Sequence, residues 1–308
     1  MKLCRYQTPS GPRLGFLDDN QIVAAPNDPL FADTLAFIRG GRKALKLAAA
    51  ALKNRRAKRT PLSRVKLLAP LLPSTILCSG SNYIDHNAEK SNTPISGKEP
   101  EFFVKTADCV IGPGEPIIHD ERLSRKIDCE TELAVVIGKP GRYIPEEKAL
   151  DHVFGYTIVN DVTARDRQVR QKDGVTWYEL GRGKAFDSSA PLGPMIVTAD
   201  EIGDPQNLKL VTRINGETRQ SSHTSRMIWS CAKLIHFFST NFTLKPGMVI
   251  ITGTPSGTAW SVDKELGGKF TPQPGLTPTT RYCLPGDVIE SEIEKIGVLR
   301  NPIKAYAA

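Results

Sequence analysis

The most constraining feature of this chain is a succession of short, largely apolar segments that are separated by glycine and proline turns. Strands are predicted over residues 76–78, 102–105, 133–137, 153–159, 208–214, 248–252 and 288–296. Turn pairs such as Pro140-Gly141 and Asn215-Gly216 lie between them. Many strands with hairpin turns and few helices argue against a doubly wound parallel sheet. The sequence therefore predicts a β-rich α+β fold.

Two helices and a domain boundary are predicted from the remaining pattern. Residues 34–58 carry apolar side chains at helical spacing, with a break expected at Gly40-Gly41, and residues 225–241 carry a second apolar stripe. Residues 6–24 have the alternation of a small hairpin. Several prolines follow the first helix. We therefore expect a small N-terminal α/β domain over residues 1–70 and a larger domain over residues 71–308.

Charge and cysteine content limit the classes of partner. The 308 residues include 41 Lys+Arg and 33 Asp+Glu, a formal net charge of +8. Ten of the positive charges lie in residues 42–66, which contain neither an acid nor an aromatic residue, so a solvated basic face is expected rather than a nucleic-acid site. The six scattered cysteines form no C-x-x-C pair, which favours reduced, buried thiols. With neither a membrane-length apolar stretch nor a secretory leader, a cytoplasmic protein without membrane contact is expected.

Carboxylates lie at the ends of two predicted buried strands. Glu130 and Glu132 alternate with apolar residues next to Asp128, so in a strand they would share one face. Asp161 follows the apolar segment 153–159. A site of three carboxylates without a His or Cys ligand suits a hard cation, Mg²⁺ first and then Mn²⁺ or Ca²⁺. From these residues alone, a solvated acidic edge strand and a helix cap at Asp161 are alternatives.

Three further groups could complete a chemical site. His86 and Glu89 would lie side by side on a helical turn, where a carboxylate raises the basicity of an imidazole that acts on water; a surface pair is the commoner alternative. Lys184 stands among glycines and could stabilise an enolate, or face solvent. The Gly-rich turn at 253–257 could offer backbone N–H groups to an anion. Phosphate-loop and serine-hydrolase signatures are absent from the sequence.

Taken together, these segments resemble the fumarylacetoacetate hydrolase family over about residues 70–305. The motifs that carry the resemblance occur in one order and are Asn82-Tyr83-x-x-His86-x-x-Glu89, Asp128-x-Glu130-x-Glu132, Asn160-Asp161-x-x-x-Arg165-x-x-Gln168, Gly183-Lys184, Gly253-Thr254-Pro255-x-Gly257 and Pro285-Gly286-Asp287. The resemblance implies a catalytic domain built as a roll of mixed β-sheets, preceded by a variable leader domain. It also implies a homodimer.

The resemblance further implies a role for each matching residue. Glu130, Glu132 and Asp161 match the metal ligands of the family. His86 and Glu89 match its water-activating dyad, and Lys184 matches the catalytic lysine beside the metal. The residues implied in substrate binding are Tyr83, Arg165, Gln168, Gly253 and Thr254.

The activity expected from this resemblance is metal-dependent hydrolysis of a C–C bond in a small anionic 2-oxoacid or β-diketo acid, such as an acylpyruvate or a fumarylacetoacetate-like compound. Alternatives are a decarboxylase or isomerase of the 2-hydroxyhepta-2,4-diene-1,7-dioate type and a lyase or hydrolase of 2-oxo-3-deoxy sugar acids. A non-catalytic nucleic-acid-binding protein is the alternative from a different class.

Two segments depart from the usual family pattern and leave the substrate open. Residues 258–284 are longer than the corresponding loop of many relatives, and could extend the pocket wall or reach a neighbouring subunit. The interval from Asp161 to Lys184 is also long, with Trp177 and Tyr178 inside it.

Overall fold

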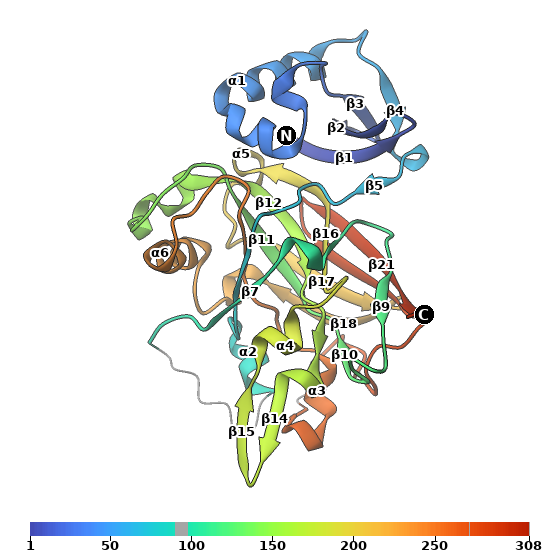
Figure 1. The fold of residues 1–308 in the computed structure, drawn as a ribbon, viewed down its shortest axis with the longest axis vertical. Coiled ribbons are helices and arrows are strands. Elements are labelled where there is room, and N and C mark those ends of the chain that lie inside the picture. Colours follow the sequence, from blue (N-terminus) through green and yellow to red (C-terminus); the bar gives the residue numbers. More distant parts are fainter. Residues whose placement is uncertain (90–97, 271, 308) are drawn as a thin grey trace.

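Most strands of the protein belong to two sheets, as seen in a computed structural model that describes residues 1–89, 98–270 and 272–307 (Figure 1). The larger sheet has the order β4 (Arg59–Pro61), β3 (Gln21–Ala24), β2 (Gly11–Asp18), β1 (Lys2–Thr8), β16 (Ala190–Thr198), β12 (Val153–Asn160), β11 (Thr131–Ile137), β19 (Val249–Ile251), β6 (Ile76–Ser79) and β7 (Phe102–Lys105). Two short strands join it at the side, β5 (Leu67–Leu68) on β1 and β8 (Val110–Ile111) on β16.

The smaller sheet and two ribbons complete the β-structure. The sheet has the order β18 (Glu217–His223), β17 (Lys209–Ile214), β20 (Val288–Ile293), β21 (Gly297–Ala305) and β9 (Ile117–His119). The ribbons pair β10 (Ile127–Asp128) with β13 (Thr163–Ala164), and β14 (Val169–Lys172) with β15 (Val175–Tyr178). The helices are α1 (Thr34–Lys53), α2 (Ile84–Ala88), α3 (Arg165–Gln168), α4 (Leu180–Lys184), α5 (Ala199–Ile202) and α6 (Cys231–Asn241). The mixed, sheet-dominated α+β fold is the one that the sequence predicts.

The N-terminal segment extends the main sheet. β1 pairs antiparallel with β16, and α1 packs its buried Phe37, Ala44 and Ala48 against the N-terminal strands (Figure 1). The expected break in the helix is confirmed, because Gly41 has φ 50° and kinks it. α1 ends at Lys53 and not at Lys58. The basic side chains between residues 42 and 66 are exposed apart from the half-buried Arg59, which confirms a solvated basic surface.

The core lies on both faces of β11. All seven residues of this strand are buried between β12 and β19, which agrees with its continuous apolar sequence. α6 covers one face with Leu234, Ile235 and Phe238. This helix begins at Cys231 and not at Ser225, because Ser230 caps it by accepting a hydrogen bond from Lys233 N–H (3.1 Å). All six cysteines are buried and free, as expected.

Turn chemistry explains where the sequence patterns succeed and fail. The hairpin β17–β18 turns at Asn215-Gly216, whose φ angles of 54° and 83° suit the predicted tight turn. Asp173-Gly174 makes the same kind of turn between β14 and β15, with φ angles of 52° and 79°. β14, β15 and β16 are among the strands that the sequence patterns do not predict. The strand predicted to reach residue 296 ends at Ile293, where the chain turns into β21.

No helix among the described residues is long and apolar enough to cross a membrane.

Candidate metal centre and active site

Three buried carboxylates meet at the point where β11 begins and β12 ends. Glu130 precedes β11, Glu132 lies within it and Asp161 follows β12; a carboxylate oxygen of each lies within 4.8 Å of the others. The pairing of Thr131 with Asn160 brings the two strand ends together, and Asp161 N–H donates to the Glu130 carbonyl (2.8 Å). The sequence predicts that Glu130 lies within a strand. In the structure, residues 129–130 separate β10 from β11, and Glu130 belongs to neither strand. The alternative of a solvated edge is wrong, because the three side chains are buried. The alternative of a helix cap at Asp161 is also wrong, because β13 follows this residue and the N-cap position of α3 is Ala164.

Two lysines balance part of this negative charge. Lys184 Nζ lies 2.5 Å from Glu130 Oε2 and 2.7 Å from Asp161 Oδ2, and Lys105 Nζ lies 2.6 Å from Asp161 Oδ1. Both lysines are buried, so Lys184 does not face solvent. Gly183 allows this arrangement, because a Cβ there would lie 2.6 Å from the Cα of Gln168 and force α3 and α4 apart.

Arg165 links the triad to two further polar groups. Its guanidinium donates to Glu130 Oε1 (2.5 Å), Asp128 Oδ2 (2.8 Å) and Gln168 Oε1 (2.9 Å). Asp128 also accepts the backbone N–H groups of Ala259 (3.0 Å) and Trp260 (3.2 Å). Asp128 therefore does not join the triad; it holds Arg165 and the segment 258–284 in place.

The crowding of charges shifts the pKa values of the triad in opposite directions. Burial would raise the pKa of Glu130, but Lys184 and Arg165 outweigh it and hold that pKa well below its usual range. Burial and the facing carboxylates of Asp161 and Glu130 raise the pKa of Glu132 well above its usual range. Burial would lower the pKa of Lys184, but Asp161 and Glu130 outweigh it and raise that pKa. Two carboxylates are thus paired with lysines, whereas Glu132 is crowded by its neighbours.

The donor set fits a hard divalent ion. Asp128 and the three triad carboxylates carry four negative charges, and Lys105, Lys184 and Arg165 carry three positive ones, so the formal sum is 3 − 4 = −1. A dication would relieve the repulsion at Glu132 and offset the negative charge of these groups. The ligand atoms that the triad offers are carboxylate oxygens, which suit Mg²⁺, Mn²⁺ or Ca²⁺. The buried acidic triad could therefore hold a divalent metal.

The His86–Glu89 pair is buried and close. Glu89 follows α2, and its Oε2 lies 2.7 Å from His86 Nδ1. Glu89 also accepts hydrogen bonds from Gly257 N–H (2.6 Å) and the Thr258 hydroxyl (3.0 Å). Both side chains of the pair are about 5% exposed, so the alternative of a surface pair is wrong. Burial raises the pKa of Glu89 to about 8, against the opposing effect of these two hydrogen bonds.

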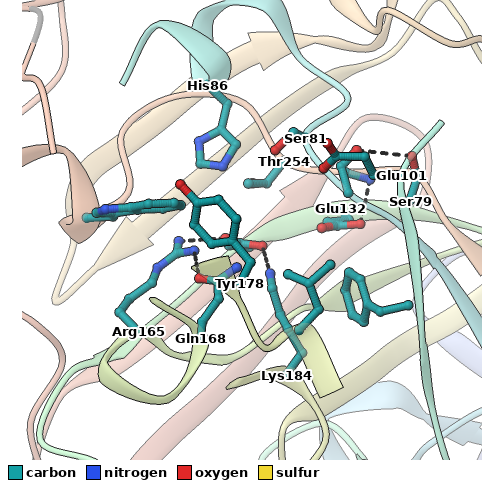
Figure 2. A pocket seen from close by; sticks show the side chains of 16 residues that line it. Ser79, Ser81, His86, Glu101, Glu132, Arg165, Gln168, Tyr178, Lys184 and Thr254 are labelled. Atoms are coloured by element: carbon teal, nitrogen blue, oxygen red, sulfur yellow. Dashed lines mark hydrogen bonds and ion pairs between the residues drawn. The ribbon is translucent and has the colours of Figure 1, made fainter. Parts of the chain in front are cut away.

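A cavity joins the pair and the triad (Figure 2). In this view His86 lies across the cavity from Arg165, Gln168 and Lys184, which come from α3 and α4. The predicted site residues that line the cavity are His86, Glu130, Glu132, Arg165, Gln168, Lys184, Gly253 and Thr254. Asp161 lies behind Lys184, and Glu89 lies behind His86.

Two predicted substrate contacts need correction. Tyr83 is fully buried and packs in the core with Leu77 and Leu133, so its ring does not line the cavity. The N–H of Gly253 donates to Glu132 Oε2 (2.6 Å), so in this structure it positions a triad member instead of pointing at a substrate.

Several residues at the site are not among those that the sequence patterns assign to it. Lys105 could have been noticed as a lysine in an apolar strand, because a charge there needs a buried partner. Asp128 belongs to a matched motif but shows its contact to Arg165 only in the fold. Tyr178 and Trp260 come from the two long intervals and line the cavity. Their identity as aromatic residues alone does not predict that placement.

Fold and site together bring a carboxylate triad that could hold a divalent metal close to a lysine and a buried His–Glu pair. Comparison with known families is consistent with this. The model of the fumarylacetoacetate (FAA) hydrolase C-terminal domain matches residues 75–304, and an Rv2993c-like N-terminal model matches residues 1–70. The chain belongs to the fumarylacetoacetate hydrolase family, and it is an enzyme of that family.

Similar proteins are known from animals and bacteria. The chain is 39% identical to "Oxaloacetate tautomerase fahd2, mitochondrial" of Xenopus laevis over 98% of this chain and 90% of that protein. It is 43% identical to "Oxaloacetate tautomerase YisK" of Bacillus subtilis over 79% of this chain and 74% of that protein.

Solved structures share the fold along the whole chain. A fumarylacetoacetate hydrolase from Exiguobacterium antarcticum is 35% identical, with a TM-score of 0.79 and coverage of 99% of this chain and 100% of that one. A maleylpyruvate hydrolase from Sphingobium sp. SYK-6, solved with manganese(II) and pyruvate, is 27% identical, with a TM-score of 0.77 and full coverage of both chains (100% each).

Proposed function

We propose that this protein is a divalent-metal-dependent tautomerase that interconverts the keto and enol forms of a small 2-oxoacid of the oxaloacetate class. The observation that carries the proposal is that His86 lines the same cavity as Glu130, Glu132 and Lys184, with His86 and Lys184 on opposite sides of it in Figure 2. In this arrangement a base faces Lys184 and the divalent ion that the triad would hold. Both positive charges can stabilise an enolate. Relatives that align with nearly the whole chain and are named oxaloacetate tautomerases support the same activity.

The metal would be held by Glu130, Glu132 and Asp161. When bound, Mg²⁺ would act as a Lewis acid toward the 2-oxo oxygen, and Mn²⁺ or Ca²⁺ are alternatives. Lys184 contributes a fixed positive charge at the same point. An ammonium has three N–H donors, and its bonds to Glu130 and Asp161 use two of them. The negative charge that develops on the substrate oxygen is therefore stabilised by a group that is already oriented.

The proton is moved by the dyad. With Glu89 ionised, its bond to His86 Nδ1 keeps the hydrogen on Nδ1 and leaves Nε2 as the basic nitrogen. Nε2 takes the proton from C3, the C–H electron pair forms the C2–C3 double bond, and the carbonyl electron pair moves to oxygen. Return of a proton to that oxygen completes the enol. Arg165 and Gln168, already hydrogen-bonded to each other (2.9 Å), would orient the substrate carboxylate.

Hydrolysis of a C–C bond is the second candidate. The same dyad would then activate water for attack on a carbonyl, and the departing fragment would leave as an enolate. The structural likeness to a maleylpyruvate hydrolase that was solved with manganese(II) and pyruvate favours this activity. Isomerisation of 2-hydroxyhepta-2,4-diene-1,7-dioate type acids, the name of a further structural neighbour, uses the same enolate chemistry. A lyase or hydrolase of 2-oxo-3-deoxy sugar acids is the remaining alternative.

The deciding experiment follows two substrates with one preparation. Enol oxaloacetate is monitored by its ultraviolet absorbance, and acetylpyruvate products are identified by mass spectrometry, each with Mg²⁺ and with EDTA. We expect metal-dependent acceleration of ketonisation and intact acetylpyruvate. Cleavage of acetylpyruvate would favour the hydrolase. Equal ketonisation by the wild type and by His86→Gln, both loaded with Mg²⁺, would remove the proposed base.

Other expectations from the sequence also stay proposals. We propose a cytoplasmic homodimer, with a small N-terminal domain over residues 1–70 and a catalytic domain over residues 71–308. Animal relatives carry the word mitochondrial in their names, so a fractionation experiment in the native cell is the relevant test. We also propose that the exposed basic surface of residues 42–66 binds no nucleic acid, which a duplex titration at low salt would check.

A further inference from the structure

Two segments outside the shared motifs reach the cavity and meet there. Tyr178 ends the β14–β15 hairpin, and Trp260 begins the segment 258–284. Their ring centroids are 5.9 Å apart with an interplanar angle of 64°, an edge-on contact between aromatic rings. Both residues line the cavity that contains His86 and Arg165. An aromatic pair therefore forms one wall of the site.

Trp260 is held in place from several directions. Its side chain is buried, its Nε1–H donates to the Leu266 carbonyl (2.9 Å) and its backbone N–H donates to Asp128 (3.2 Å). The Arg165 guanidinium lies 5.1 Å from the ring centroid, on the ring face. The segment is fastened further by Asp263, which pairs with Lys126 (2.7 Å) and accepts from the Tyr282 hydroxyl (2.6 Å). These contacts fix the position of the indole ring of Trp260 at the cavity.

Tyr178 reaches the cavity from a different element, the end of β15. In the view of Figure 2 its ring is drawn between His86 at the top and Arg165 and Gln168 below, with the hydroxyl end on the side of His86. The hairpin is tied to the site through Glu179 N–H, which donates to the Gln168 carbonyl (2.8 Å). The preceding residue, Trp177, is 39% exposed and does not line the cavity, because neighbouring residues of a strand point to opposite faces.

The cavity beside Tyr178 and Trp260 offers little space beyond that needed by the reacting end of a substrate. The cavity has a volume of about 50 Å³. Its polar groups, among them Arg165, Gln168 and Lys184, would engage the carboxylate and 2-oxo end of the acid. The remainder of the acid would point toward the aromatic pair. With the head bound in this way, a short acid would end beside the rings, and a longer tail would have to pass them.

We propose that Tyr178 and Trp260 form the specificity wall of this enzyme and limit its substrates to short 2-oxoacids with a chain of about four carbons, excluding acylpyruvates with long tails. The inference rests on the proposed function, because it assumes that the head of a 2-oxoacid binds at the triad. The two segments that depart from the family pattern would then determine which acids this member accepts.

The test separates binding of the head from rejection of the tail. Oxalate serves as the head alone, and N-methyl, N-propyl and N-hexyl oxamate add tails of increasing length. Dissociation constants are measured by calorimetry on Mn²⁺-loaded wild type, Tyr178→Ala, Trp260→Leu and, as matched control, Trp177→Ala. We expect the wild type and Trp177→Ala to bind N-hexyl oxamate at least about tenfold more weakly than N-methyl oxamate. In Tyr178→Ala this ratio falls toward one while oxalate affinity stays within about threefold.

The outcomes are distinguishable. Equal binding of all oxamates by the wild type, or an unchanged ratio in Tyr178→Ala, would overturn the specificity wall and leave the proposed function intact. Failure of oxalate to bind the wild type would overturn the proposed function and this inference with it. Tyr178→Phe removes only the hydroxyl and is expected to keep the wild-type ratio; a ratio near one there would overturn the assignment to the ring. Tyr178→Ala is informative even if the buried Trp260→Leu does not fold.

Discussion

The two sides of the cavity are built in different ways. On the triad side, Glu130, Glu132 and Asp161 are anchored at the buried ends of two central strands of the main sheet. On the opposite side, α2, the β14–β15 hairpin and the segment 258–284 are short peripheral elements joined by individual hydrogen bonds (Figure 1). The difference teaches that the charges are set by the core, whereas the base and the proposed specificity wall depend on contacts between surface segments.

We expect the largest effect from a substitution that removes one charge on the triad side of the cavity. Glu132→Gln should lower activity at least about 100-fold, because a proposed metal ligand is lost. Mn²⁺ binding by calorimetry should weaken in parallel. The free energy of unfolding should not fall, since the substitution relieves repulsion from Asp161 and Glu130. The exposed control Glu121→Gln should leave all three quantities unchanged. Full Mn²⁺ affinity in Glu132→Gln would contradict its role as a ligand.

A second change on the triad side should act on stability. Lys105→Met removes the fully buried partner of Asp161 and leaves that carboxylate short of positive charge. We expect the free energy of unfolding in urea to fall by about 3–5 kcal/mol. The matched control is Lys66→Met, because Lys66 pairs with Glu115 at 3.7 Å on the surface and should contribute less than about 1 kcal/mol. Equal effects of the two substitutions would show that burial does not distinguish these ion pairs.

On the opposite side, Thr258→Val should change the pH profile more than the fold. The pKa of Glu89 is raised to about 8, so its carboxylate forms, and orients His86, only as the pH rises through that value. Activity should therefore increase with pH on this limb. The Thr258 hydroxyl donates to Glu89 and lowers its pKa, so its removal should move the limb to higher pH by about one pH unit. Thr258→Ser keeps the hydroxyl and should retain the wild-type profile of kcat/KM.

The smallest effect is expected where the segment 258–284 is fastened. Asp263→Asn weakens the contacts to Lys126 and the Tyr282 hydroxyl, and should lower the free energy of unfolding by about 1 kcal/mol and raise KM for oxaloacetate about threefold. Glu265 also contacts Lys126 but is 85% exposed, so Glu265→Gln should change stability by less than about 0.5 kcal/mol. A KM effect in Glu265→Gln equal to that of Asp263→Asn would contradict this assignment.

The sequence by itself determined the local structure and the acidic triad. The apolar runs of β11 and β12 predict buried strands, because burial on both faces requires continuous apolar side chains. The carboxylates at their ends and the His86–Glu89 spacing then follow from residue order. The same patterns do not include the β14–β15 hairpin, although Asp173-Gly174 is a turn pair of the type that makes one.

Only the tertiary structure decided the contacts between distant segments. Lys105 reaches Asp161 across 56 positions of the chain, and Asp128 meets Trp260 across 132. Tyr83 points into the core although it stands three residues from His86, because its orientation is set by packing. Periodicity shows which face of an element is apolar, but not which other element will cover it. The triad was therefore visible in the sequence, whereas the aromatic wall opposite it appeared only when two separate loops came together.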